Sequence, residues 1–198
     1  MPSACAVALV LLLDASGSVS AGDWRMQAHG TADAIADDAV VRIIERQGAV
    51  AMTAIAFSDI TRPLVPWRVL TGPEEAQAFA QSLRDAPRTL HGGTRIGEAL
   101  NDAIAAFDDA PCLAEQEVVD ISSDGDAEPG PTGLARDAAA LRGVRVNAIG
   151  IGTLPNGTPA DWLRDNAVTA GGFALSAGDW GDFARAMRRK LAMELAVR

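Results

Sequence analysis

The residues from Ala4 to Leu13 form an unbroken apolar run, ACAVALVLLL, which ends at Asp14. The run is too short for a transmembrane helix, which needs roughly 20 such residues. It also lacks the basic residue before it and the A-x-A site after it that mark a signal peptide. A strand of a parallel sheet that is buried on both faces is typically apolar at every position. The run therefore predicts a central strand with helices packed on both of its sides.

Strand-like and helix-like segments alternate along the remaining chain. Further strands are expected at 49–57, 118–122, 144–152 and 172–176, and helices at 23–45, 73–84, 95–107, 132–142, 161–168 and 179–196. The segment 62–70 contains two prolines, so it is at best an antiparallel edge strand. This order predicts an α/β fold: a doubly wound, Rossmann-like, mostly parallel central sheet flanked by helices. The 198 residues suit a single domain, 1–198.

The charge of the chain argues against nucleic acid as a partner. The net charge is -9 at pH 7, whereas a nucleic-acid surface normally needs a basic stripe. Basic residues cluster only between Arg185 and Lys190, near the end of a helical pattern, where cations suit the helix dipole. The apolar residues of the same segment are more typical of a core than of a partner surface, namely Phe183, Met187, Leu191 and Leu195.

Polar loops follow two of the predicted strands and precede one helix. DASGS begins at Asp14, SSDGDAE spans 122–128, and HGGTR spans 91–95. In doubly wound sheets, ligands bind beside the carboxyl ends of the strands, so these loops are the candidate site. Turn residues alone would explain one such loop, but they do not require acids at the ends of two adjacent strands.

Three kinds of reactive site fit these loops poorly. A phosphate-binding loop is disfavoured because the chain has neither G-x-G-x-x-G nor G-K-[ST]. A phosphatase of the haloacid dehalogenase class would need a second aspartate where Ser16 stands and a lysine near the site, and the only lysine is Lys190. A serine hydrolase would need a base, but His29 lies inside a predicted helix, His91 is a loop residue, and no G-x-S-x-G elbow is present.

A divalent cation fits the same loops better. Hard cations such as Mg²⁺ take oxygen ligands and usually retain some water. The carboxylates of Asp14 and Asp124 and the hydroxyl groups of Ser16, Ser18 and Thr94 would supply such ligands. Two aspartates balance the charge of one Mg²⁺ ion, and one coordination position would stay open for a ligand.

These five residues resemble the D-x-S-x-S…T…D signature of the metal-ion-dependent adhesion site in von Willebrand factor type A domains. They occur in the family's order and at similar separations, and the resemblance covers nearly the whole chain. Several stretches, among them VPWRVL and VVDISSDGDAEPG, also resemble an uncharacterised bacterial subgroup of that fold, known only as a domain of unknown function. The resemblance implies a von Willebrand factor type A architecture.

The resemblance also implies roles for the residues. Ser16, Ser18 and Thr94 would contact the metal directly, and Asp14 and Asp124 would bind it directly or through water. Mg²⁺ is the expected ion, with Mn²⁺ and Ca²⁺ as alternatives. Two further residues are candidates for the surroundings of the metal, Asp126 and Ser58.

The function that the resemblance implies is a non-enzymatic, divalent-metal-dependent module that binds a protein partner. An acidic side chain of that partner would complete the coordination, and the module is expected to be monomeric. The alternative is an accessory or regulatory subunit of an enzyme complex of the chelatase or ATPase type.

The two cysteines bear on the compartment. In the fold of the resembled family, the strands that contain or follow Cys5 and Cys112 are parallel neighbours, and both cysteines would lie at the edge opposite the metal. The resemblance therefore implies a Cys5–Cys112 disulfide, although two cysteines alone also suit reduced, buried thiols. A disulfide would imply a periplasmic or extracellular location, and reduced thiols would leave the cytoplasm as the alternative.

Overall fold

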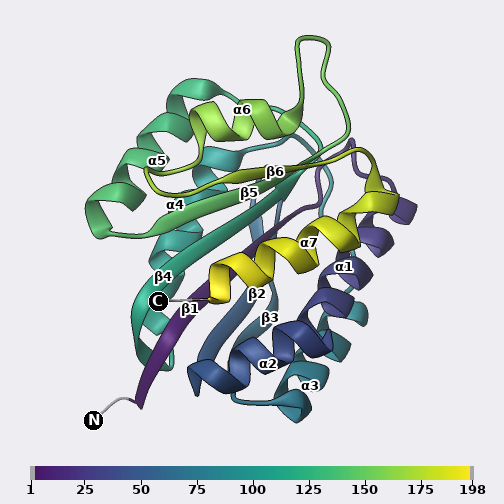
Figure 1. Cartoon of the computed structure of the whole chain (residues 1–198). Coiled ribbons are helices and arrows are strands. Elements are labelled where there is room, and N and C mark those ends of the chain that lie inside the picture. The colour runs from purple at the N-terminus through teal and green to yellow at the C-terminus, as the bar shows by residue number, and fades with distance from the viewer. Residues whose placement is uncertain (1–2, 197–198) are drawn as a thin grey trace.

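A computed structural model describes residues 3–196 and shows a six-stranded sheet between two layers of helices (Figure 1). The strand order is β3-β2-β1-β4-β5-β6, and every neighbouring pair is parallel except β2 and β3. The strands are β1 (Ser3–Asp14), β2 (Val50–Phe57), β3 (Thr61–Leu70), β4 (Cys112–Ser123), β5 (Arg145–Ile151) and β6 (Ala174–Ala177). The helices are α1 (Ala21–Ile35), α2 (Asp38–Gln47), α3 (Pro73–Arg84), α4 (Ile96–Ala106), α5 (Pro129–Arg142), α6 (Pro159–Asn166) and α7 (Trp180–Leu195), with a short 3-10 turn η1 (Phe107–Asp109). The predicted doubly wound sheet with one antiparallel edge strand is confirmed.

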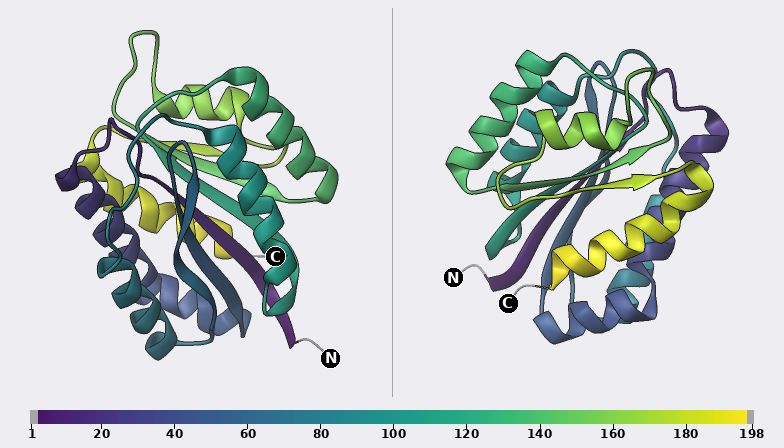
Figure 2. Two further views of the ribbon diagram at one scale, coloured as in Figure 1. Left: turned by 180° about the vertical axis from the view of Figure 1, so that it is seen from behind. Right: turned by 45° about the horizontal axis from the view of Figure 1, so that its top comes forward.

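The central strand β1 is buried on both faces, as its apolar run predicts. Its odd-numbered side chains from Val7 to Leu13 join the core that α1, α2, α3 and α7 cover. The even-numbered side chains from Ala8 to Leu12 join the second core, under α4, α5 and α6. Figure 2 shows these two helical layers on opposite faces of the sheet. This alternation decides which face each polar residue at the strand ends occupies.

The prediction of one helix over 23–45 is wrong, because the segment forms two helices. α1 ends at Ile35, and Asp37 begins α2 by accepting a hydrogen bond from the Ala39 backbone N–H at 2.9 Å. An aspartate at this position satisfies a free N–H group of the new helix. The apolar spacing continues through the break, so periodicity alone did not reveal it.

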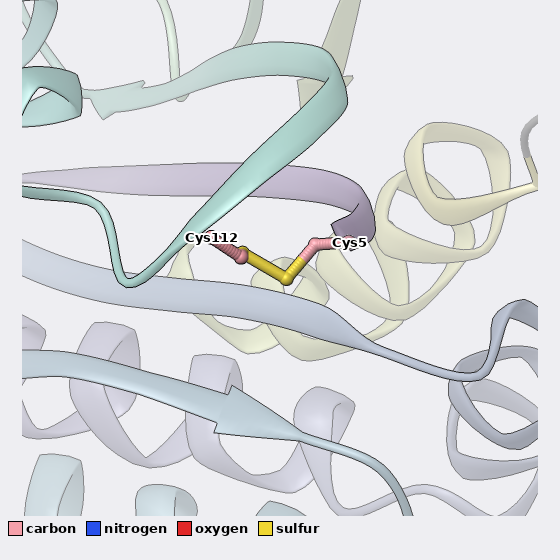
Figure 3. Close-up of a disulfide and its surroundings, with 2 residues drawn as sticks. All are labelled: Cys5 and Cys112. Atoms are coloured by element: carbon pink, nitrogen blue, oxygen red, sulfur yellow. A yellow bond between two sulfur atoms is a disulfide. The ribbon is translucent and has the colours of Figure 1, made fainter. Parts of the chain in front are cut away.

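The strand expected at 118–122 is also longer than predicted, because β4 begins at Cys112. This extension lies beside the first residues of β1, with Ser3 opposite Cys112 and Cys5 opposite Ala114. Cys5 and Cys112 form a disulfide with a Cα–Cα distance of 5.8 Å (Figure 3). Both cysteines are buried in the core under α4. The expected disulfide is confirmed, and it joins β1 to β4 at the amino ends of the two strands.

A buried ionic cluster attaches α7 to the sheet. Lys190 Nζ lies 2.6 Å from Asp120 Oδ1 of β4 and also contacts Glu194 Oε1 one turn further along α7. Asn147 of β5 donates a hydrogen bond from Nδ2 to Glu194 Oε1 at 2.8 Å. All four residues are almost completely buried. Lys190 is therefore a core residue, although it belongs to the basic cluster from Arg185 to Lys190.

The apolar face predicted for α7 is confirmed, because its four residues are fully buried. They pack in the core shared with α1 and α2. Among residues 3–196, no helix combines the length and the apolar character needed to cross a bilayer.

Candidate metal centre

The first loop of the candidate site begins where β1 ends. Asp14 continues the even-numbered row of β1 and is buried. Its Oδ1 accepts a hydrogen bond from the Ser16 backbone N–H at 2.8 Å, which turns the chain sharply after the strand. The hydroxyl groups of Ser16 and Ser18 then lie 3.2 Å apart, with Ser16 buried and Ser18 exposed. The spacing by two thus places three oxygen-bearing side chains within one tight turn.

The loop after β4 meets this turn directly. Ser18 Oγ donates a hydrogen bond to Asp124 Oδ1 at 2.7 Å, across 106 positions of sequence. The contact is possible because β1 and β4 are parallel neighbours, so their carboxyl ends lie at the same edge of the sheet. Four of the five predicted residues are therefore linked by hydrogen bonds.

Thr94 lies in the third loop, which packs against the other two. The Gly17 backbone N–H donates to the Gly92 carbonyl at 2.7 Å, and the Arg95 N–H donates to the Ser58 carbonyl at 3.1 Å. A Cβ atom placed on Gly125, next to Asp124, would lie 3.5 Å from Thr94 Oγ1. The structure thus brings all five predicted residues to one edge of the sheet.

Gly92 explains why this third loop needs glycine. Its φ angle is 135°, a conformation that residues with side chains rarely adopt, and a Cβ there would lie 2.1 Å from Asp59 Oδ2. The same Asp59 carboxylate accepts a hydrogen bond from the Gly93 N–H at 2.7 Å. Asp59 therefore holds the loop that carries Thr94 against the end of β2.

Among residues 3–196, neither Asp14 nor Asp124 forms an ion pair with a basic side chain. Burial raises the pKa of Asp14 to about 6, and the hydrogen bond from Ser123 only partly opposes this effect. Burial also raises the pKa of Asp124, and the hydrogen bond that Ser18 donates lowers it by a smaller amount. A bound divalent cation would favour the ionised form of both groups. Hydroxyl and carboxylate oxygens are also the donor types that Mg²⁺ accepts, so the residues present fit such an ion.

Three residues that support the site were not identified from the sequence. Ser123 Oγ donates to Asp14 Oδ2 at 2.5 Å, and Gln27 Nε2 donates to the Asp14 carbonyl at 2.8 Å. Arg88 Nη2 donates to the carbonyls of Ala15 at 3.2 Å and Ser16 at 2.7 Å. The sequence could have predicted that Ser123 is buried, because strand alternation places it on the same face as the apolar residues Val119 and Ile121. No sequence pattern predicts the contacts of Gln27 and Arg88, because these contacts depend on how α1 and the segment after α3 pack.

The two additional candidates differ in their position. Ser58 is buried, and its Oγ has no hydrogen-bond partner among residues 3–196. It directly follows Phe57, whose carbonyl accepts a hydrogen bond from the Ala15 N–H at 2.8 Å. Asp126 is exposed and lines a separate hollow beside Trp162. Ser58 thus follows a residue that contacts the first loop, whereas Asp126 lines a different hollow.

The sequence matches the model of one protein family, described as "Protein of unknown function (DUF1194)", over residues 4–198. The chain belongs to DUF1194. No curated protein matches the sequence of this DUF1194 member.

Solved structures show the fold of this DUF1194 chain to be that of a von Willebrand factor type A domain. A von Willebrand factor type A protein from Catenulispora acidiphila superposes with a TM-score of 0.71 at 19% identity, covering 95% of this chain and 42% of the other. Proximal thread matrix protein 1 from the mussel byssus, with a zinc-occupied metal-ion-dependent adhesion site, gives 0.74 at 21% identity, covering 98% and 48%. The corresponding domain of the pilus tip protein Mfa5 from Porphyromonas gingivalis gives 0.69 at 11% identity, covering 98% and 97%. The DUF1194 chain spans less than half of the first two proteins.

Proposed function

We propose that residues 1–198 form one von Willebrand factor type A domain that binds a protein partner through a divalent cation, without catalysing a reaction. The observation that carries the proposal is the meeting of three loops at Ser18, Asp124 and Thr94, beside the buried carboxyl group of Asp14. The mussel protein supports the general use of a metal at such a motif, because its structure has zinc there.

In this proposal, Ser16, Ser18 and Thr94 supply neutral oxygen ligands, and Asp14 and Asp124 supply the negative charge. Mg²⁺ is the proposed ion, and Mn²⁺ or Ca²⁺ would suit the same oxygen atoms. Bound there, the ion would offer a positive charge to an acidic side chain of the partner. Ser123 and Gln27 keep Asp14 in place through the hydrogen bonds described above.

A catalytic role finds little support in the geometry. Within residues 3–196, neither His29 nor His91 forms a hydrogen bond with a serine of the site, and both are exposed. A hydroxyl nucleophile needs a base within hydrogen-bond reach. We therefore favour binding over catalysis.

The deciding measurement is Mg²⁺ binding by isothermal titration calorimetry, comparing Asp124→Asn with Asp126→Asn. Both substitutions remove one negative charge from the same loop, so long-range electrostatics change equally. We expect Asp124→Asn to weaken Mg²⁺ binding at least about tenfold, because second-sphere changes alone cost 10–100-fold. Asp126→Asn should change it by less than about threefold, since an exposed charge is screened by solvent. Equal effects of the two substitutions, or no Mg²⁺ binding by the wild type, would refute the metal site.

The disulfide supports a periplasmic or extracellular location for the domain. Structural disulfides form and persist in oxidising compartments, and Cys5 and Cys112 are both buried. Mass spectrometry after alkylation without reductant, on protein taken from its native cells, tests the location. Two alkylated thiols would contradict this location.

We also propose that the domain is a monomer, and sedimentation analysis of the purified protein would measure its oligomeric state.

A further inference from the structure

A groove on the outer side of α1 has chemistry that the metal site does not use. Its volume is about 260 Å³, and it lies between one face of α1 and the segment that follows α3. The α1 wall has a helical spacing of three and four residues. The lining residues used below are Trp24, Arg25, His29, Arg84, Pro87 and Arg88.

The floor of this groove is apolar and fixed. Trp24 is buried, and its indole Nε1–H donates to the Ala86 carbonyl at 3.4 Å, which ties the segment after α3 to α1. Pro87 and Ala28 add further apolar surface. An occupant with a ring or a short aliphatic body would therefore bury apolar area here.

The rim is basic, in a chain whose net charge is -9. Three arginines and one histidine line the groove, and within residues 3–196 only Arg84 among these arginines has an acidic partner, Asp33, at 2.6 Å. Arg25 has no ion pair within residues 3–196. Arg88 donates from Nη2 to two neutral carbonyls, and its buried Nε has no hydrogen-bond partner in the described part of the chain. Arg25 and Arg88 thus line the groove, and neither forms an ion pair with a carboxylate of residues 3–196.

We propose that this groove binds a small organic anion, a carboxylate carried on an apolar body. The carboxylate would contact Arg25 and Arg88, and the body would lie over Trp24. Charge-assisted hydrogen bonds from guanidinium groups are the strong kind. The site is separate from the metal centre, although Arg88 also holds the carbonyl of Ser16.

The test is a titration of the full chain with benzoate, followed by NMR at the indole N–H of Trp24. The chain has four tryptophans, and the Trp24→Phe variant identifies the resonance. Benzamide has the same ring without the charge, and inorganic phosphate has charge without the ring. We expect a saturable shift with benzoate at about millimolar concentration, and much weaker effects with the other two probes. A benzamide shift equal to that of benzoate, or no saturable shift, would overturn the proposal.

The Arg25→Gln variant provides the specific control, because Arg25 is exposed and makes no ion pair with the described residues 3–196 whose loss could unfold the protein. We expect it to weaken benzoate binding about tenfold, the effect of losing one charged hydrogen bond. Arg46→Gln, on the exposed face of α2, removes the same charge outside the groove. It should leave binding unchanged. Equal weakening by both variants would show attraction by net charge alone, and no weakening by Arg25→Gln would remove this arginine from the site.

Discussion

Ser123 connects two loops of the candidate metal centre through a single hydroxyl group. Its Oγ donates to Asp14 Oδ2 at 2.5 Å and accepts a hydrogen bond from the Gly125 N–H at 3.2 Å. Asp14 is buried, so the loss of this donor would remove a hydrogen bond from a carboxylate oxygen in the protein interior. Ser122, its neighbour in β4, lies only at 3.5 Å from the Leu12 carbonyl. The two serines therefore form a matched pair for mutation.

We expect Ser123→Ala to lower the free energy of unfolding by about 1–3 kcal/mol, because a buried acceptor loses its donor. Ser122→Ala should cost less than about 1 kcal/mol, since its hydrogen bond is long. Urea denaturation in EDTA measures both values without a contribution from metal. Equal losses for the two variants would show that the Asp14 contact adds no stability.

The residues of the site were predictable to the extent that their positions follow from the ends of strands. Asp14 and Asp124 each lie at or just after the carboxyl end of a predicted strand, so their loops could be placed at one edge of the sheet from the sequence alone. Gln27 and Arg88 could not be placed, because their contacts with the first loop depend on the packing of α1 and of the segment after α3. Sequence patterns define the faces of elements, but they do not define which side chains meet between distant elements.

At the scale of elements, α7 joins the sheet through charge as well as through apolar packing. Burial, together with the nearby Asp120 carboxylate, raises the pKa of Glu194 to about 8, against the opposing effect of Lys190. With Glu194 protonated, the cluster contains one cation and one anion. Asp120 Oδ2 and Glu194 Oε2 have no hydrogen-bond partner among residues 3–196. Ionisation of Glu194 would add a second, uncompensated negative charge to the core.

The raised pKa of Glu194 predicts how the free energy of unfolding changes with pH. Its ordinary pKa is 4.5, so between about pH 4.5 and 8 the folded protein retains a proton that the unfolded chain releases. Stability from this group is complete below that interval and is lost as the pH rises through it. We expect the free energy of unfolding to fall between pH 6 and 8, by up to about 1.4 kcal/mol per pH unit. Asp14 should add little there, because its pKa is about 6.

The Glu194→Gln variant isolates this effect, because glutamine retains an oxygen acceptor for Lys190 and Asn147 but cannot ionise. Urea denaturation in EDTA across that pH range should show a flatter dependence than in the wild type. Glu45→Gln, on the exposed side of α2, should keep the wild-type slope. An unchanged slope in Glu194→Gln would mean that this group does not titrate within the core.

For α7, the sequence predicted the apolar packing of the helix but not its buried ion pair with the sheet. Its apolar face was predictable from helical spacing, and these residues are buried. The basic cluster from Arg185 to Lys190 was explained by the helix dipole, and this explanation did not predict that Lys190 is buried. The position of Asp120 could have predicted a buried cation, because a charged residue in the middle of the predicted strand VVDIS needs a buried partner. The topology then brings β4 and α7 together, which local patterns do not specify.

At the scale of the whole molecule, the disulfide and the candidate metal centre occupy opposite edges of the same sheet. Cys5 and Cys112 lie 107 positions apart in sequence, so their bond restricts a large part of the unfolded chain. We expect Cys5→Ala/Cys112→Ala to lose about 2–4 kcal/mol of stability. Its Mg²⁺ affinity, measured by calorimetry, should match that of the wild type because the site is remote. A large loss of affinity in a folded double variant would contradict this separation.

β1 runs without interruption from the disulfide end of the sheet to Asp14. A partner held at the metal loops would pull on the carboxyl ends of β1 and β4 together, because the loop after each strand contributes to the site. The sulfur–sulfur bond joins the same two strands at their other ends (Figure 3). A force applied at the metal loops would therefore be shared by two strands that a covalent bond joins at their amino ends. The disulfide would therefore oppose sliding of β1 past β4 at their amino ends, while hydrogen bonds such as Ser123 to Asp14 hold their carboxyl ends together.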